Sequence, residues 1–332
     1  MSDKVRIGVI GIGWWSNVLA GAAQRTSNLE VAACYTRSAD KREAFAREFS
    51  CSAAATFEEM LQDPSIDGII NTTPNHVHLD TTRMAADNGK HMFLDKPIAN
   101  SVRHGLEIAR ICRDANVVLA MGYQRRREGQ FRWIQERINA GEFGILVQAE
   151  ANISRDRAGK FEPGHWRYTA EGMPGGVILQ IGLHYVDVLE MLLGPVAEVS
   201  GMASQLVLPG DNPDVGSLLM KHENGAISTL NTSYASASEH YVMNIYGKKA
   251  SGFFDAQRGL SYLEQGGDGA VPVEVAKVDA IAEELEEWGR AIRGEGVPEV
   301  GGEDATRSLA VVLAGVRSVE ERRTVAVSEM YD

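Results

Sequence analysis

A lysine between a carboxylate and a proline is the first residue in the sequence whose position suggests chemistry. Lys96 follows the apolar, strand-like run 91–94, with Asp95 before it and Pro97 after it. An ammonium group at the carboxyl end of a strand can polarise a carbonyl oxygen or pass a proton to it. A lysine in a loop is usually just solvated, so this interpretation needs partner groups elsewhere in the chain.

Polar groups with a helical spacing supply such partners. A glycine-rich turn at 172–176 precedes the helix-like run 177–187, in which Gln180, His184 and Asp187 fall at i, i+4 and i+7 and so share a face. Histidine can give or accept a proton near neutral pH, whereas the Gln180 amide can only hydrogen-bond. A buried, hydrogen-bonded histidine would explain this segment about equally well. Gly182 favours the interpretation that His184 faces a ligand-binding cleft, because glycine lets a backbone or ligand approach closely.

A glycine-rich turn follows the first strand-like run, residues 5–10, and opens a helix-like segment. Bare backbone in such a turn can approach a pyrophosphate at the positive end of a helix, which predicts a dinucleotide site. Ser16 stands where the third glycine or alanine is usual, and its small side chain still permits close packing. The predicted cofactor contacts here are Gly11, Ile12, Gly13, Trp14 and Trp15, although tryptophans at a helix start more often pack than bind.

The second strand-like run, residues 30–35, ends without the acidic residue that accepts hydrogen bonds from a ribose 2′-hydroxyl. Thr36, Arg37 and Ser38 stand there instead. The guanidinium fork of Arg37 suits a 2′-phosphate, and the two hydroxyls can assist it. We therefore expect NADP, with NAD as a possible cofactor, unless Arg37 is simply a solvated charge.

Further candidates follow other strand ends and one loop. The strand-like run 68–71 leads into a loop whose proposed cofactor contacts compete with a simpler interpretation as a turn and helix cap. Residues after the strand-like run 117–121 are candidates for cofactor or substrate contacts, and the alternative is that the arginines there form an exposed basic face. The aromatic plane of Trp166 beside the guanidinium of Arg167 would suit a substrate ring that carries hydroxyls or a carboxylate. These candidates are Thr73, Pro74, Asn75, His78, Gln124, Arg125, Trp166 and Arg167.

Together these motifs resemble the glucose-fructose oxidoreductase, inositol dehydrogenase and rhizopine catabolism protein family, Gfo/Idh/MocA. The resemblance spans essentially the whole chain, in family order. It rests on the runs 8–13, 73–75, 95–97, 122–126, 175–176 and 182–184. Asp95 replaces the family's usual Glu before the lysine. Gln180 replaces the Asp of its Asp-x-Gly-x-His pattern, and an amide cannot act as a base.

The resemblance implies nicotinamide-dependent redox chemistry with Lys96 and His184 as catalytic residues. We expect Gln180 to position the substrate, and Asp95 and Lys96 also to contact the cofactor. The predicted substrate-binding set is Lys96, Arg125, Trp166, Arg167, Gln180 and His184. It also implies a Rossmann domain, and a second domain that binds substrate and forms homodimers or homotetramers.

The charge and cysteine content of the sequence argue against several classes of binding partner. Lysine and arginine total 33 against 45 acidic residues, a formal charge of −12 that opposes binding to nucleic acid or anionic membranes. Three scattered cysteines without CxxC spacing argue against a disulfide framework or a thiolate zinc site, and we expect no metal. No secretory leader or apolar run of spanning length is evident, so we predict a cytoplasmic protein.

Element patterns divide the chain in two. Short apolar runs at 5–10, 30–35, 68–71, 91–94 and 117–121 alternate with helix-like segments, which predicts a doubly wound parallel sheet. From residue 144 the strand-like runs become more frequent, which predicts a large, open and mostly antiparallel sheet in an α+β domain. We place the Rossmann domain at 1–122 and the substrate-binding and oligomerisation domain at 123–332.

We therefore expect an NADP-dependent oxidoreductase that moves a hydride between nicotinamide and a secondary alcohol or ketone of a sugar, cyclitol or related cyclic polyol. Two alternatives remain open. One is a dihydrodiol dehydrogenase of the same family, favoured if the cleft is apolar around Trp166. The other is a dinucleotide-binding regulator without turnover, suggested by Gln180.

Overall fold

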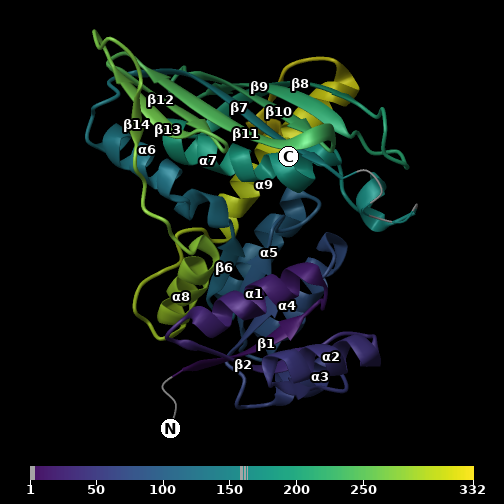
Figure 1. The fold of residues 1–332 in the computed structure, drawn as a ribbon. Coiled ribbons are helices and arrows are strands. Elements are labelled where there is room, and N and C mark those ends of the chain that lie inside the picture. Colours follow the sequence, from purple (N-terminus) through teal and green to yellow (C-terminus); the bar gives the residue numbers. More distant parts are fainter. Residues whose placement is uncertain (1–3, 158–159, 161, 163) are drawn as a thin grey trace. The chain divides into compact units, whose positions relative to one another are not determined.

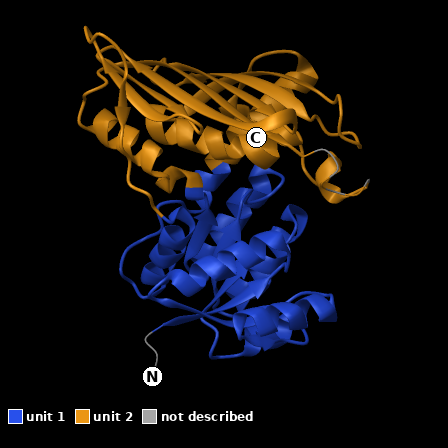
Figure 2. Ribbon diagram, viewed as in Figure 1, with its two compact units in different colours: residues 1–124, 279–306 blue, residues 125–278, 307–332 orange. Residues whose placement is uncertain are grey.

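The computed structural model describes residues 4–157, 160, 162 and 164–332, which form two compact units (Figures 1 and 2). Unit 1 comprises the chain up to Gln124 together with Asp279–Thr306. Unit 2 comprises Arg125–Val278 and Arg307–Asp332. No helix among the described residues is long and apolar enough to cross a membrane.

Unit 1 contains a six-stranded, wholly parallel sheet in the order β3-β2-β1-β4-β5-β6. This order is that of a doubly wound Rossmann sheet, as the alternating pattern predicted. Its strands are β1 (Val5–Ile10), β2 (Leu29–Tyr35), β3 (Ser52–Ala53), β4 (Gly68–Asn71), β5 (His91–Asp95) and β6 (Leu119–Gly122). Its helices are α1 (Trp14–Arg25), α2 (Ala39–Phe49), α3 (Phe57–Gln62), α4 (His78–Asp87), α5 (Val102–Asp114) and α8 (Ala280–Ile292).

The core of unit 1 depends on a segment from late in the sequence. Trp288 of α8 is fully buried against Phe93 of β5, with ring centroids 5.8 Å apart, and Leu285 joins the same apolar cluster. Gly68 permits this packing, since a Cβ there would lie 2.8 Å from the Trp288 ring. Residues 279–306, which we expected to belong with the second half, are therefore part of unit 1.

Unit 2 is built on a nine-stranded sheet in the order β14-β13-β12-β11-β7-β10-β9-β8-β15. Only β7 and β10 pair in parallel, so the expected mostly antiparallel sheet is confirmed. Its strands are β7 (Leu146–Asp156), β8 (Val196–Ser204), β9 (Val215–His222), β10 (Ile227–Ser233), β11 (Ala235–Gly247), β12 (Ala250–Asp255), β13 (Gly259–Glu264), β14 (Val271–Val273) and β15 (Val325–Ala326).

One face of this sheet packs on helices and the other is open, as its alternating burial shows. Along β9, Leu218 and Met220 are buried while Leu219 and Lys221 are exposed. The covering helices are α6 (Gly129–Asn139), α7 (Leu183–Leu193) and most of α9 (Gly302–Glu321), visible along one side of the sheet in Figure 1. Helix α7 packs against β7 and β10 of this sheet.

Candidate active site

The turn after β1 is shaped to accept a phosphate group. Gly11 has a φ of +81°, and a Cβ there would lie 2.5 Å from backbone atoms of Thr72 and Thr73. Only glycine fits this position. The hydroxyl of Ser16 accepts a hydrogen bond from the Gly13 N–H and donates one to the Gly13 carbonyl, each at 2.8 Å. Ser16 therefore braces the turn at the start of α1, where backbone N–H groups attract an anion.

The two tryptophans of this turn differ in environment. Trp14 is 72% exposed, and its ring lies 5.5 Å from that of Trp15. The indole N–H of Trp15 donates a hydrogen bond of 3.0 Å to Oδ1 of Asp95. Trp15 was predicted as a cofactor contact. The structure adds a direct link from the glycine turn to the residue before Lys96.

Lys96 follows β5 at the carboxyl edge of the sheet and is half-buried. Its backbone leads into the buried Pro97 through a cis peptide bond. Asp95 on its other side is held by Trp15. The edge of the sheet therefore carries the glycine turn and the lysine motif within one unit, as the spacing predicted.

The loop after β4 is tightly organised beside the glycine turn. The side-chain Oδ1 of Asn71 accepts hydrogen bonds from the backbone N–H and the hydroxyl of Thr73. The Thr72 hydroxyl donates to the backbone carbonyls of Ile10 and Gly11. Pro74 is half-buried, and Asn75 is buried and donates to Asn100. The loop thus presents Thr73 and Pro74 at the same edge as Gly11.

His78 occupies a different place from the predicted cofactor contact. It is 1% exposed, its Nε2 lies 2.8 Å from the Thr73 carbonyl, and its Nδ1 lies 3.1 Å from the Pro97 carbonyl. Burial lowers the pKa of this imidazole. His78 therefore ties the loop after β4 to the lysine loop and leaves almost no surface for a ligand.

The turn after β2 holds the residues expected to recognise a ribose phosphate. The Thr36 carbonyl accepts a hydrogen bond of 2.8 Å from Arg42, and Ser38 caps α2 by accepting from Lys41 at 3.5 Å. Arg37 lies between them and is exposed. A guanidinium beside the first turn of a helix leaves this turn electropositive.

Gln180 and His184 lie on one continuous helical segment of unit 2. Residues Ile178–Gly182 form a π-helical turn, in which the Leu183 N–H bonds the carbonyl of Ile178, and α7 continues from there. Such turns are frequent at functional sites. Gly182 approaches β10, since a Cβ there would lie 3.0 Å from the Thr232 side chain. Its smallness therefore serves packing against the sheet.

Asp187, the third polar group of this segment, is a structural ion-pair partner. Its carboxylate binds Nε and Nη2 of Arg126, each at 2.7 Å, with side chains only 1% and 9% exposed. Arg127 is buried as well. The arginine run 125–127 is therefore not an exposed basic face, and the pair fastens the segment after β6 to α7.

Gln124 and Arg125 stand at the boundary of the two units. Oε1 of Gln124 is buried without a hydrogen-bond partner among the described residues. Arg125 belongs to unit 2, where it binds Glu128 at 2.8 Å. Burial raises the pKa of Glu128 even though this arginine acts in the opposite sense.

The guanidinium group of Arg167 packs on the ring of Trp166, as the sequence analysis expected. Cζ of Arg167 lies 4.3 Å from the Trp166 ring centroid. The His165 ring also stacks on Trp166, with ring centroids 5.7 Å apart. Both are half-buried. The Arg167 carbonyl is held by Asn212 at 3.1 Å. The pair is thus a preformed flat surface within unit 2.

Three residues that the sequence analysis missed surround Arg125. Its Cζ lies 5.9 Å from the Tyr185 ring and 5.1 Å from the Tyr241 ring, and Arg155 approaches Tyr241 at 5.2 Å. They come from α7, β11 and β7. The only sequence signal for Tyr185 is its position directly after His184.

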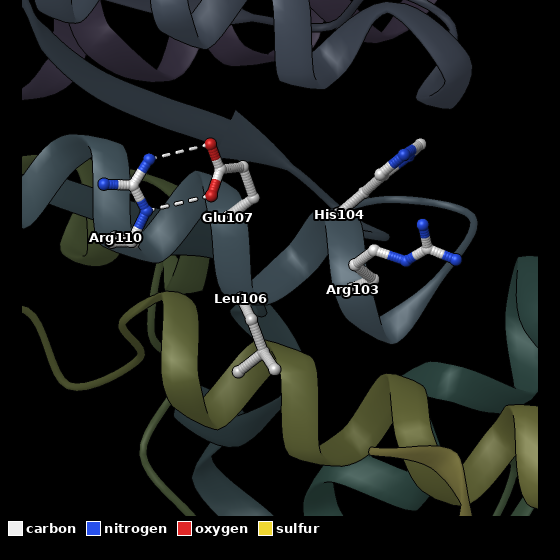
Figure 3. Close-up of a pocket in the computed structure, with 5 residues that line it drawn as sticks. All are labelled: Arg103, His104, Leu106, Glu107 and Arg110. Atoms are coloured by element: carbon white, nitrogen blue, oxygen red, sulfur yellow. Dashed lines mark hydrogen bonds and ion pairs between the residues drawn. The ribbon is translucent and has the colours of Figure 1, made fainter. Parts of the chain in front are cut away.

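A surface pocket lies elsewhere, on α5 (Figure 3). Glu107 there pairs with Arg110 at 2.9 Å, and its hydrogen bonds to Arg110 lower the pKa of the carboxylate to about 2. All the lining residues come from one exposed helix, and none is a predicted site residue. The residues drawn are Arg103, His104, Leu106, Glu107 and Arg110.

The chain is similar to known proteins over nearly its whole length. It matches the oxidoreductase family with an NAD-binding Rossmann fold over residues 5–123, and the GFO/IDH/MocA C-terminal domain over residues 131–252. It is 26% identical to 1,5-anhydro-D-fructose reductase of Ensifer adhaerens, covering 94% of this chain and 96% of that protein. It is also 26% identical to myo-inositol 2-dehydrogenase of Thermotoga maritima, over 98% and 99% of the two chains.

One solved structure extends this agreement to three dimensions. A protein of Desulfitobacterium hafniense, assigned as an NADPH-dependent oxidoreductase, matches with a TM-score of 0.93, 32% identity and full coverage of both chains. The Rossmann sheet, the large mixed sheet and the order of the site motifs thus agree with the matches to both domain models. The chain belongs to the Gfo/Idh/MocA family of oxidoreductases.

Proposed function

We propose that the chain is an NADP-dependent oxidoreductase that moves a hydride between nicotinamide and a secondary alcohol or ketone of a sugar, cyclitol or related cyclic polyol. The observation that carries this proposal is the Trp15–Asp95 hydrogen bond, which joins the glycine turn to the Lys96 motif within unit 1. The relatives support the substrate class, because anhydrofructose and myo-inositol are both cyclic polyols.

The residues of unit 1 fit a dinucleotide. Gly11 lets the glycine turn pass close to the backbone of the loop after β4, and Ser16 braces the turn at the positive end of α1. Ile12, Gly13 and Trp14 complete the turn that we propose to contact the cofactor. When bound, the nicotinamide supplies or accepts the hydride.

Side chains of this protein transfer the proton to and from the substrate oxygen. The Lys96 ammonium donates a hydrogen bond to the substrate oxygen, and its proton moves to that oxygen on reduction and returns on oxidation. His184 assists this transfer from unit 2. The Gln180 amide holds a neighbouring hydroxyl, because it can donate and accept hydrogen bonds but cannot take up a proton.

Replacing Lys96 by Met tests the catalytic assignment. We expect turnover to fall by about a hundred- to ten-thousand-fold while the dissociation constant of the cofactor changes little, since a positioned proton donor is worth that much. Turnover is read at the reduced-nicotinamide absorbance, and binding by nicotinamide fluorescence. Lys248→Met, an exposed lysine of unit 2, is the control. Unimpaired turnover in the Lys96 variant would remove it from the mechanism.

Replacing Arg37 by Ala tests the preference for NADP. Losing a charge-assisted bond of about 1.5–3 kcal/mol should lower the ratio of NADP to NAD affinity by about ten- to hundred-fold. Arg47→Ala removes a 73% exposed arginine from α2, the helix that follows Arg37, and should leave the ratio unchanged. An unchanged ratio in the Arg37 variant would contradict its role.

Gln180 favours a second candidate, a dinucleotide-binding regulator without turnover. This candidate predicts cofactor fluorescence in titrations but no change in absorbance with polyols, sugars, inositols or dihydrodiols. Oxidation of any member of that panel excludes it. Dihydrodiols as the preferred substrates would instead favour the dihydrodiol dehydrogenase alternative.

We also propose a cytoplasmic homodimer or homotetramer. The open face of the unit 2 sheet supports assembly, because it carries exposed apolar side chains such as Leu219. Light scattering on the full chain measures the subunit number, and a monomer at micromolar concentration would contradict this proposal.

A further inference from the structure

Unit 2 holds a cluster of two arginines and two tyrosines, of which only Arg125 belongs to the predicted substrate-binding set. We call Arg125, Arg155, Tyr185 and Tyr241 the arginine–tyrosine cluster. Both guanidinium groups approach the Tyr241 ring, at 5.1 Å and 5.2 Å from its centroid, and Arg125 also approaches Tyr185 at 5.9 Å. Residues from four separate elements thus bring two positive charges to one aromatic ring.

The cluster holds guanidinium N–H donors that the described residues do not satisfy. Arg125 is 15% exposed and forms a 2.8 Å ion pair with Glu128, whose pKa is raised by burial. Arg155 is 22% exposed and pairs with Glu239 at 3.9 Å, a carboxylate that is itself 60% exposed. Nε of Arg125 and Nε of Arg155 are both buried without a hydrogen-bond partner among the described residues. Each arginine therefore has a carboxylate near it but keeps an unsatisfied N–H, and the carboxylate partner of Arg155 is distant and largely exposed to solvent.

A neutral donor in the cluster also lacks an acceptor. Tyr185 is fully buried, and its hydroxyl has no hydrogen-bond partner among the described residues. A buried hydroxyl without a partner costs free energy, so buried polar groups normally find one. Tyr185 directly follows His184 on α7, so this unsatisfied donor belongs to the helix that carries a proposed catalytic group.

An acceptor with a single negative charge would satisfy this arrangement. A carboxylate is planar, accepts bonds in the plane of a guanidinium fork and carries a single negative charge. A phosphate dianion would bring about two negative charges to a cluster in which each arginine already lies near a glutamate. The cluster therefore suits a carboxylate better than a phosphate.

We propose that the arginine–tyrosine cluster binds a carboxylate of the substrate, so that the preferred substrate is an acidic sugar or cyclitol and not a neutral one. This inference rests on the proposed function, whose substrate class it narrows. Arg155 supplies the main ion pair, because Glu128 already binds Arg125. Tyr241 holds both guanidinium groups in place.

Paired substrates test the proposal directly. Glucuronate, galacturonate and mannuronate are compared with glucose, galactose and mannose, which differ only in carrying a hydroxymethyl group instead of the carboxylate. With NADP present, we expect at least one acid to have a higher kcat/KM than its neutral parent. Equal or higher values for the neutral parent in all three pairs would overturn the proposal.

Arg155→Met then removes the charge while keeping a long side chain. Loss of a charged hydrogen bond should lower the acid-to-neutral ratio of kcat/KM by about ten- to hundred-fold. Arg155→Lys, which retains the charge, should recover part of that ratio. Arg137→Met is the matched control, since Arg137 also lies over a ring, Trp133 at 4.9 Å, and pairs with a carboxylate at 3.5 Å. Equal losses on acid and neutral substrates would indicate a merely structural Arg155.

Calorimetry separates this inference from the proposed function. The NADP-loaded protein is titrated with the same six compounds. Binding of an acid that is weakened in the Arg155→Met variant supports the cluster even if no compound is turned over. Turnover of neutral polyols with neither binding of an acid nor selectivity for one would leave the proposed function intact and refute the carboxylate site.

Discussion

Replacing Asp187 by Asn removes one charge from a buried ion pair while nearly preserving the shape of the side chain. Both oxygens of Asp187 bind Arg126 at 2.7 Å, and the two side chains are 1% and 9% exposed. Breaking a buried pair by neutralising one partner costs about 3–5 kcal/mol, because the other charge stays buried. An amide still accepts one hydrogen bond, so we expect about 3 kcal/mol.

For a unit of this size, that loss lowers the melting temperature by about 6–12 °C. Scanning calorimetry of the full chain measures it, with the exposed Asp268→Asn of the same unit as control. Replacing the pair together, Arg126→Met with Asp187→Leu, should cost less than the single change, since apolar packing can substitute for a buried pair. A loss below about 1 kcal/mol in the Asp187 variant would refute the reasoning.

Three further outcomes follow from the structure. Gly11→Ala should destabilise unit 1 and abolish cofactor binding, because its Cβ would meet backbone at 2.5 Å; Gly13→Ala, with 3.9 Å of space, should leave the melting temperature unchanged. Trp15→Phe removes the N–H that holds Asp95 and should lower turnover about tenfold, with cofactor affinity changed less than threefold by fluorescence. Burial raises the pKa of Glu190 to about 7, so its contribution to stability is full below the unfolded value near 4.5 and is lost as pH rises through 7. Glu190→Gln should therefore flatten the loss of stability between pH 4.5 and 7 in urea titrations.

Sequence periodicity predicted the strands of unit 1 because parallel strands buried on both faces leave continuous apolar runs. Residues 68–71 coincide with β4, and 5–10 with β1. β3 and α3 were missed, since a two-residue strand and a six-residue helix leave almost no periodic signal. The membership of α8 in unit 1 was missed for another reason: contacts across the sequence are invisible to local patterns.

The candidate site likewise contains residues that local sequence motifs predict and residues that only the fold brings together. Motifs that are contiguous in the chain, such as the glycine turn and Asp95-Lys96, could be predicted and lie at one edge of the sheet. His78 matched a helix-start pattern, and only the structure showed that both its nitrogens face carbonyl groups. Arg155 and Tyr241 come from β7 and β11, whose pairing brings them together, and neither belongs to a motif.

The discontinuity of unit 1 constrains how the protein is made. A nascent chain delivers β1 to β6 first, but Trp288 and the rest of α8 are synthesised about 150 residues later. At about 5–20 residues per second, the first sheet waits roughly 8–30 s on the ribosome with one apolar patch uncovered. Translation pauses before residue 279 would lengthen that exposure, so aggregation during synthesis should be sensitive to codon usage in this interval.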